Sequence, residues 1–149
     1  MKILVKNQKV FFNYEIQDKY NAGIELFGFE VKSVKQGKGN MEGSYIVIRG
    51  GEAFLIGLDI PPFQQNNTPE GYDPKRNRRL LLSKKELTIL AEKENESGLT
   101  IVPILLYNNG RRIKLELGTA KGKKKFDKRQ TIKKRESDKE ISRTLKSGR

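Results

Sequence analysis

The 149-residue sequence contains neither cysteine nor histidine. The absence of cysteine excludes a disulfide framework and thiolate metal sites, and the absence of histidine removes the commonest zinc ligand and the usual acid–base group. The longest early apolar run is Ile3, Leu4 and Val5, which is far shorter than a signal peptide or a membrane-spanning helix. The sequence therefore predicts a cytoplasmic, non-enzymatic protein with no cofactor and no membrane partner.

Acidic residues are scarce relative to basic ones. The chain has 31 lysines and arginines against 18 aspartates and glutamates, which gives a net charge of +13. Such an excess on a small protein indicates a polyanionic partner, for which nucleic acid is the natural candidate. Residues 1–120 carry 18 basic and 14 acidic side chains, whereas residues 121–149 carry 13 and 4. We therefore expect one domain over residues 1–120 and a basic tail over residues 121–149.

The first 120 residues have the pattern of a β-rich domain. Short apolar runs, typical of strands, alternate with turn residues, and Asn109-Gly110 is the clearest hairpin turn. Ser83 and Glu86 have the spacing of a capping box, which predicts a helix over residues 84–97. The expected fold is a small OB-like β-barrel with a short helix, because closure of the sheet leaves few exposed edges. The expected strands span residues 10–16, 24–34, 45–48, 53–60, 100–107 and 113–117.

The predicted tail has no hydrophobic stripe that could face a core. Its few large apolar residues include Ile132 and Ile141, which fall on opposite sides of an ideal helix. We therefore expect the free tail to be disordered and to become helical on a partner that screens its charge.

Three basic groups are candidates for contacts with a nucleic acid. The first precedes the apolar residues 80–82 and could hold phosphates beside a packed strand, with a solvated loop as the alternative interpretation. The two lysines of the second group, Lys32 and Lys35, would lie on opposite faces of a regular strand. The third group surrounds the predicted hairpin tip at Asn109-Gly110. These groups are Lys75, Arg76, Arg78 and Arg79; Lys32 and Lys35; and Arg111, Arg112 and Lys114.

Aromatic and acidic residues suggest two further kinds of chemistry. Phe63 and Tyr72 lie in a polar loop, where they are the better exposed candidates for stacking on bases. The carboxylates match no metal-binding spacing, but they leave a carboxylate-dependent nuclease as one alternative function. The acidic candidates are Glu25, Glu30, Glu52 and Asp59.

Residues 28–40, with the sequence GFEVKSVKQGKGN, resemble the signature of the SsrA-binding protein family, also called small protein B. Residues 51–55, 73–82, 98–103, 120–124 and 127–129 agree with the same family in the same order. The resemblance implies a non-catalytic barrel that binds the tRNA-like domain of transfer-messenger RNA in trans-translation. It also implies delivery to stalled 70S ribosomes alongside elongation factor Tu, with the basic tail entering the empty mRNA channel. Composition and fold alone would also allow another ribosomal or initiation-factor-like RNA-binding barrel.

The resemblance assigns roles to individual positions. Leu81 corresponds to a packing contact with the RNA and Lys114 to a phosphate contact. Asn21 stands where the family usually has glutamate, and Phe12 lies where it often has a basic stretch with a histidine. Together with the basic groups, the expected RNA contacts are Asn21, Lys32, Lys35, Arg76, Arg78, Arg79, Leu81 and Lys114. The expected contacts of the tail with the ribosome and mRNA channel are Lys121, Gly122, Lys123, Lys124, Asp127, Lys128 and Arg129.

Overall fold

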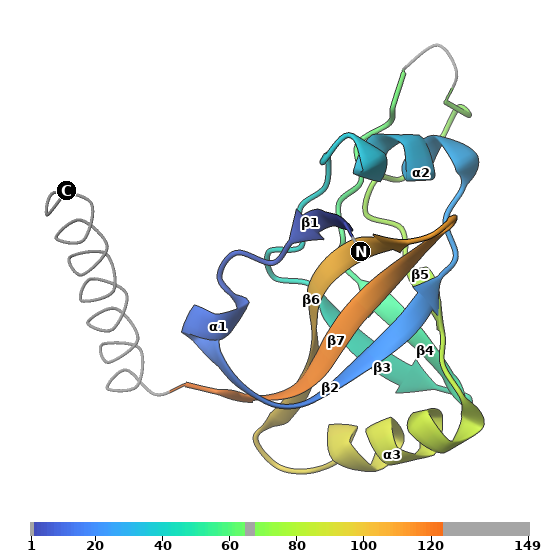
Figure 1. Ribbon diagram of the computed structural model, residues 1–149. Coiled ribbons are helices and arrows are strands. Elements are labelled where there is room, and N and C mark those ends of the chain that lie inside the picture. Colours follow the sequence, from blue (N-terminus) through green and yellow to red (C-terminus); the bar gives the residue numbers. More distant parts are fainter. Residues whose placement is uncertain (1, 65–67, 124–149) are drawn as a thin grey trace, which may run out of the picture.

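The structure is a computed structural model that describes residues 2–64 and 68–123 (Figure 1). The expectations for Lys124, Asp127, Lys128 and Arg129, and for the order of the tail, lie outside the described residues. None of the helices in those two ranges is long and apolar enough to cross a membrane.

Antiparallel strands form a seven-stranded sheet in the order β1-β6-β3-β4-β5-β2-β7. Because β6 also pairs with β7, the sheet closes on itself and β1 extends it beside β6. The predicted mainly β, OB-like barrel is therefore confirmed. The short strands β1 and β5 are not among the predicted runs. The strands are β1 (Lys2–Lys6), β2 (Tyr14–Ile24), β3 (Tyr45–Arg49), β4 (Glu52–Ile56), β5 (Arg78–Leu81), β6 (Leu99–Asn109) and β7 (Arg112–Gly122).

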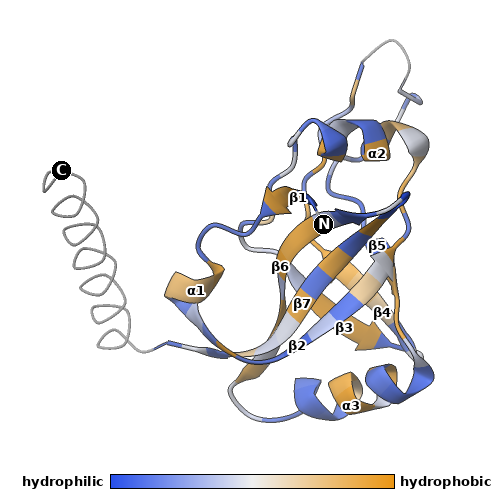
Figure 2. Ribbon diagram, in the orientation of Figure 1, coloured by the Kyte–Doolittle hydropathy of each residue, from blue (hydrophilic) through white to orange (hydrophobic). Residues whose placement is uncertain are grey.

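The hairpin between β6 and β7 has the predicted turn. Asn109 pairs with Arg112, and the turn between them uses Gly110 at φ 64°, a conformation that glycine adopts without strain. Hydrophobic and hydrophilic residues alternate along β7 (Figure 2), so that Ile113 and Leu115 are buried while Lys114 between them is only partly buried. The alternation therefore places the Lys114 side chain on the outer face of the barrel.

Two segments predicted as strands contain helices. Helix α1 (Val10–Asn13) occupies the start of the 10–16 run, and α2 (Gly28–Lys35) occupies most of the 24–34 run. Helix α2 begins where the Glu30 carboxylate accepts a 2.8 Å hydrogen bond from the Phe27 amide. Its buried residues Glu30, Ser33 and Val34 are spaced three and four apart, the period of a helix. The strand prediction was wrong because a short apolar run fits either period.

Helix α3 (Lys84–Glu94) begins with the predicted capping box. The Ser83 hydroxyl accepts from the Glu86 amide at 3.2 Å, and the Glu86 carboxylate accepts from the Ser83 amide at 3.1 Å. The helix ends three residues earlier than predicted. Helices α2 and α3 lie at opposite ends of the barrel (Figure 1), where the fully buried side chains of Val34 and Leu90 pack against the main core.

Candidate nucleic-acid interface

Three neighbouring strands bring Lys114 and Leu81 to one surface. Lys114 on β7 pairs with Gly23 on β2, and Gly23 pairs in turn with Leu81 on β5. Residues directly opposed on antiparallel strands point to the same side of the sheet, so this row faces outward together. A side chain at Gly23 would begin only 3.2 Å from the Leu81 Cβ atom. Because Gly23 has no side chain, Leu81 can lie over β2. The sequence did not indicate this role, since Gly23 falls between two of the predicted strands.

A groove of about 630 Å³ opens beside this row. Its floor is apolar, its rim is basic, and no acidic residue lines it. Leu81 is 49% exposed, which is unusual for a leucine in a strand and leaves it open to a partner. A surface of this kind suits an anionic partner that also presents an apolar face, such as the sugars and bases of RNA. The lining residues are Gly23, Ile24, Leu26, Val31, Leu81, Arg111, Arg112, Ile113 and Lys114.

Asn21 lies on the same outer face. It precedes Gly23 by two residues and pairs with Glu116 on β7. Its Oδ1 atom accepts a 2.9 Å hydrogen bond from the Tyr107 hydroxyl. Burial, reinforced by the charge of Glu116, raises the pKa of Tyr107, so this hydroxyl keeps its proton and donates. The amide nitrogen of Asn21 then remains available to donate to a partner.

Arg78 does not reach the surface. Its side chain is fully buried and donates to the Glu30 carboxylate from Nε at 3.0 Å and from a terminal nitrogen at 2.6 Å. Further donations go to the backbone carbonyls of Leu58 and Pro74. The guanidinium is thus surrounded by internal acceptors, as a buried charge must be. The expectation that Arg78 contacts RNA is corrected accordingly, and we assign this residue to the core.

The Glu30 carboxylate is the centre of this buried cluster. Besides Arg78, it accepts from Tyr72 at 2.9 Å and from the guanidinium of Arg76. Burial favours the protonated form, but the hydrogen bonds from Arg76, the Phe27 amide and Arg78 outweigh it and lower the pKa of Glu30. Burial and the hydrogen bond to the carboxylate raise the pKa of Tyr72 to about 12. Tyr72, expected to be exposed for stacking, therefore serves the cluster through its hydroxyl.

The remaining basic candidates reach the surface to different degrees. Arg79 is 43% exposed in its side chain, but it forms ion pairs with Glu25 at 3.3 Å and Glu52 at 3.1 Å. Lys32 and Lys35 are exposed, and because α2 is a helix their three-residue spacing places them on one face rather than on opposite faces. Helix formation thus joins two lysines that a strand would have separated.

The end of β7 is attached to α1. Lys121 and Gly122 belong to the strand, so β7 continues past the predicted boundary at residue 120. The Lys123 amide donates to the Asn13 carbonyl at 2.9 Å, and the Lys123 ammonium donates to the Phe11 carbonyl at 2.8 Å. Lys123, the last described residue, therefore lies next to α1.

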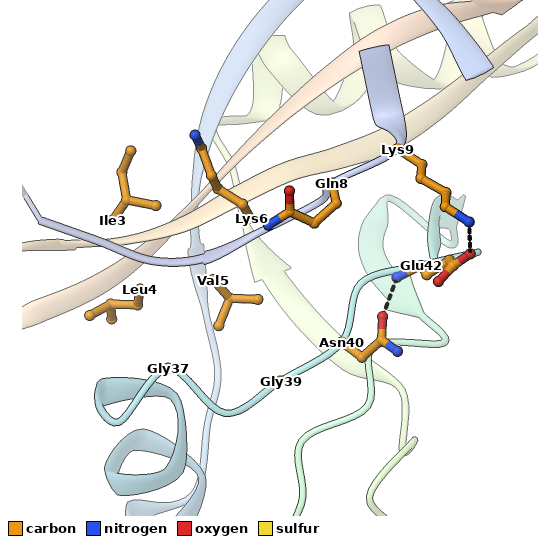
Figure 3. Close-up of a pocket in the computed structure, with 10 residues that line it drawn as sticks. All are labelled: Ile3, Leu4, Val5, Lys6, Gln8, Lys9, Gly37, Gly39, Asn40 and Glu42. Atoms are coloured by element: carbon orange, nitrogen blue, oxygen red, sulfur yellow. Dashed lines mark hydrogen bonds and ion pairs between the residues drawn. The ribbon is translucent and has the colours of Figure 1, made fainter. Parts of the chain in front are cut away.

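A second hollow, of about 400 Å³, lies between β1 and the segment after α2 (Figure 3). The Lys9 ammonium forms a 3.2 Å ion pair with Glu42, whose amide donates to Asn40. This pairing reduces the positive charge of the hollow, and none of the predicted RNA contacts lines it. Among residues 2–64 and 68–123, no group of three or more acidic side chains is arranged to hold a metal ion.

Comparisons with known proteins show the family of the chain. The family model described as SmpB protein matches residues 4–147. An SsrA-binding protein of Thermosipho africanus is 46% identical over 100% of both chains, and one of Thermosipho melanesiensis is 48% identical over 98% of this chain and 99% of the relative. A solved chain from work on tmRNA-SmpB in the bacterial ribosome shares 41% identity and a TM-score of 0.70, covering 84% of this chain and 87% of that one. The chain belongs to the SmpB family of SsrA-binding proteins.

Proposed function

We propose that this protein binds the tRNA-like domain of transfer-messenger RNA and brings it to stalled ribosomes for trans-translation, without catalysing a reaction itself. The observation that carries the proposal is the outward row of Lys114, Gly23 and Leu81 beside a basic-rimmed groove, in a chain of the SsrA-binding protein family. The solved relative was studied together with transfer-messenger RNA and the bacterial ribosome. A non-enzymatic role fits the absence of histidine and cysteine from the sequence.

Within the groove, we assign Lys114 to a backbone phosphate and Leu81 to an apolar contact with a sugar or base. Asn21 would donate to the RNA from its amide nitrogen, since its oxygen already accepts from Tyr107. Lys32 and Lys35 extend the positive surface over α2, beyond the groove residue Val31. Arg76 and Arg79 are secondary contacts, because RNA phosphates must compete with their carboxylate partners.

The proposal includes the delivery complex and the basic tail. Elongation factor Tu would accompany the protein and the RNA to the 70S ribosome. The segment from Lys121 onward, including Lys124, Asp127, Lys128 and Arg129, would contact ribosomal RNA in the mRNA channel. The charge of this segment supports that part of the proposal, since residues 121–149 carry 13 basic and 4 acidic side chains.

The test is a binding assay with the tRNA-like domain and the full-length protein. Lys114→Ala should weaken binding, while the melting temperature stays unchanged. It should also reduce the slope of the logarithm of affinity against the logarithm of salt concentration by about one, the effect of losing one phosphate contact. Lys85→Ala is the matched control, because Lys85 is an exposed lysine on α3, at the other end of the barrel. Equal affinities of the parent and Lys114→Ala would contradict the assignment of the groove.

Leu81→Ala tests the apolar contact. Full burial of a leucine stabilises a fold by about 1.5 to 3 kcal/mol, so a residue that is 49% exposed should cost about 1 kcal/mol when truncated. RNA affinity should fall more than this small loss of stability explains. Ile3→Ala is the control, since Ile3 is 43% exposed on β1, away from the groove. If both variants bind RNA like the parent, Leu81 is not part of the interface.

A further inference from the structure

Phe27 is an exposed aromatic residue next to the groove. It is 51% exposed, the largest fraction among the exposed large hydrophobic residues of the described chain. It directly follows Leu26, and the Phe27 carbonyl accepts from the amide of Val31 one helical turn later. Leu26 and Val31 both line the groove. Phe27 is therefore joined through the backbone to two residues that line the groove, Leu26 and Val31.

The outward row continues from the groove to Phe27. Gly23 lies opposite Leu81, and two residues later the Glu25 amide donates to the Arg79 carbonyl at 3.0 Å. Two residues further along, Phe27 lies against Arg76, whose guanidinium carbon is 4.1 Å from the ring centroid. The two-residue period of an extended chain thus places Gly23, Glu25 and Phe27 on the same side.

Phe27 and Arg76 are held in place before any ligand arrives. The Arg76 guanidinium is fixed by the buried Glu30 carboxylate, and only 25% of its side chain is exposed. The Phe27 ring stacks on Phe29, with centroids 5.6 Å apart and planes at 28°. Phe29 in turn packs edge-on against Tyr72 at 4.7 Å. A ligand that stacks here pays little conformational entropy, because the platform is already ordered.

We infer that Phe27, backed by Arg76, is a stacking subsite for one unpaired nucleobase of the RNA that occupies the groove. Exposed aromatic rings beside cationic groups are the usual platforms for unstacked bases. The basic rim of Arg111, Arg112 and Lys114 favours RNA over an apolar protein partner at this surface. The inference rests on the proposed function, since it names a contact of the same RNA.

The absence of tryptophan from the sequence provides a direct readout. Phe27→Trp in the full-length protein preserves the stacking surface and introduces the only indole. On titration with the tRNA-like domain of transfer-messenger RNA, its fluorescence should be quenched with the same Kd that a separate binding assay gives. Phe11→Trp is the matched control: Phe11 is 45% exposed and has the Lys19 ammonium 5.8 Å from its ring, but it lies on α1. Its fluorescence should not report the same saturation.

Affinity gives the second readout. Phe27→Ala should bind the RNA about 5- to 150-fold more weakly, which corresponds to one base–aromatic stack. Phe27→Trp should bind like the parent or more tightly, and Phe11→Ala should bind like the parent. Unfolding curves of each variant separate loss of the contact from loss of the fold.

The outcomes distinguish this inference from the function on which it rests. If the Phe27→Trp protein binds the RNA with unchanged fluorescence, or Phe27→Ala binds with parental affinity, the subsite is wrong while the function stands. If the parent protein fails to bind the tRNA-like domain at all, both are overturned.

Discussion

Replacing Glu30 by alanine should cause the largest loss of stability of any single carboxylate substitution in the barrel. The side chain is fully buried and accepts hydrogen bonds from Tyr72, Arg76 and Arg78. Its removal leaves the Arg78 guanidinium, also fully buried, without a counter-charge. Breaking a buried ion pair by removing one partner costs about 3 to 5 kcal/mol, because the remaining charge is no longer compensated.

That cost is large for a protein of this size. Domains are typically stable by about 5 to 15 kcal/mol, so a loss of about 3 to 5 kcal/mol in Glu30→Ala should remove about a fifth of the total or more. At about 4 °C per kcal/mol, the melting temperature should fall by about 12 to 20 °C. Thermal unfolding followed by circular dichroism measures the shift, and urea titration gives the free energy of unfolding at one temperature.

Glu25→Ala is the matched control. Glu25 also pairs with an arginine of β5, Arg79 at 3.3 Å, but its side chain is 52% exposed. An exposed pair of this kind contributes about 0 to 1 kcal/mol, so its removal should shift the melting temperature by a few degrees at most. If Glu30→Ala and Glu25→Ala unfold within a few degrees of each other, the reasoning about the buried cluster is wrong.

Three further predictions concern pH, salt and the basic segment. Because the fold lowers the pKa of Glu30, its ionised carboxylate stabilises the fold at pH values above the ordinary pKa of 4.5. This stabilisation is lost as the pH falls below 4.5 and through the lowered pKa, so urea titrations should show a steeper loss of stability in acid for the parent than for Glu30→Gln. If about five phosphates are engaged, the logarithm of RNA affinity should fall with the logarithm of salt concentration with a slope of about −3.5 to −4.5, and a slope near zero in filter binding would refute this. Stopping the chain after Lys123, the last described residue, should leave unfolding and most RNA binding unchanged but abolish peptide tagging on stalled ribosomes; tagging at the full-length rate would show that the segment is dispensable.

The parts of the fold that were predicted correctly depend on neighbours in the sequence. The turn at Asn109-Gly110, the alternation along β7 and the capping box of Ser83 and Glu86 are all complete within a few residues. Such patterns are decided by local backbone geometry, which a single sequence displays. The β-barrel class followed from them because short strands must close or hide their edges.

The errors arose where distant residues decide the structure. The run over residues 24–34 is apolar enough for a strand, yet a helix forms there because Glu30 caps it and is buried against arginines far along the chain. Arg78 looked like its exposed neighbours, since nothing nearby in the sequence reveals a carboxylate 48 positions earlier that pairs with it. The groove was missed for the same reason: Gly23, Leu81 and Lys114 come together only through strand pairing.

The buried cluster changes how mutations of the basic residues must be interpreted. The buried Arg78 pairs with Glu30, and Glu30 caps the start of α2. Helix α2 in turn carries Val31, which lines the groove, and the exposed Lys32. An Arg78 variant would therefore lose RNA affinity through displacement of α2, together with a large loss of stability. Lys114 should contribute little to the stability of the fold, because its side chain is only partly buried on the outer face of β7. A fall in affinity identifies a direct RNA contact only where, as expected for Lys114→Ala, the free energy of unfolding is unchanged.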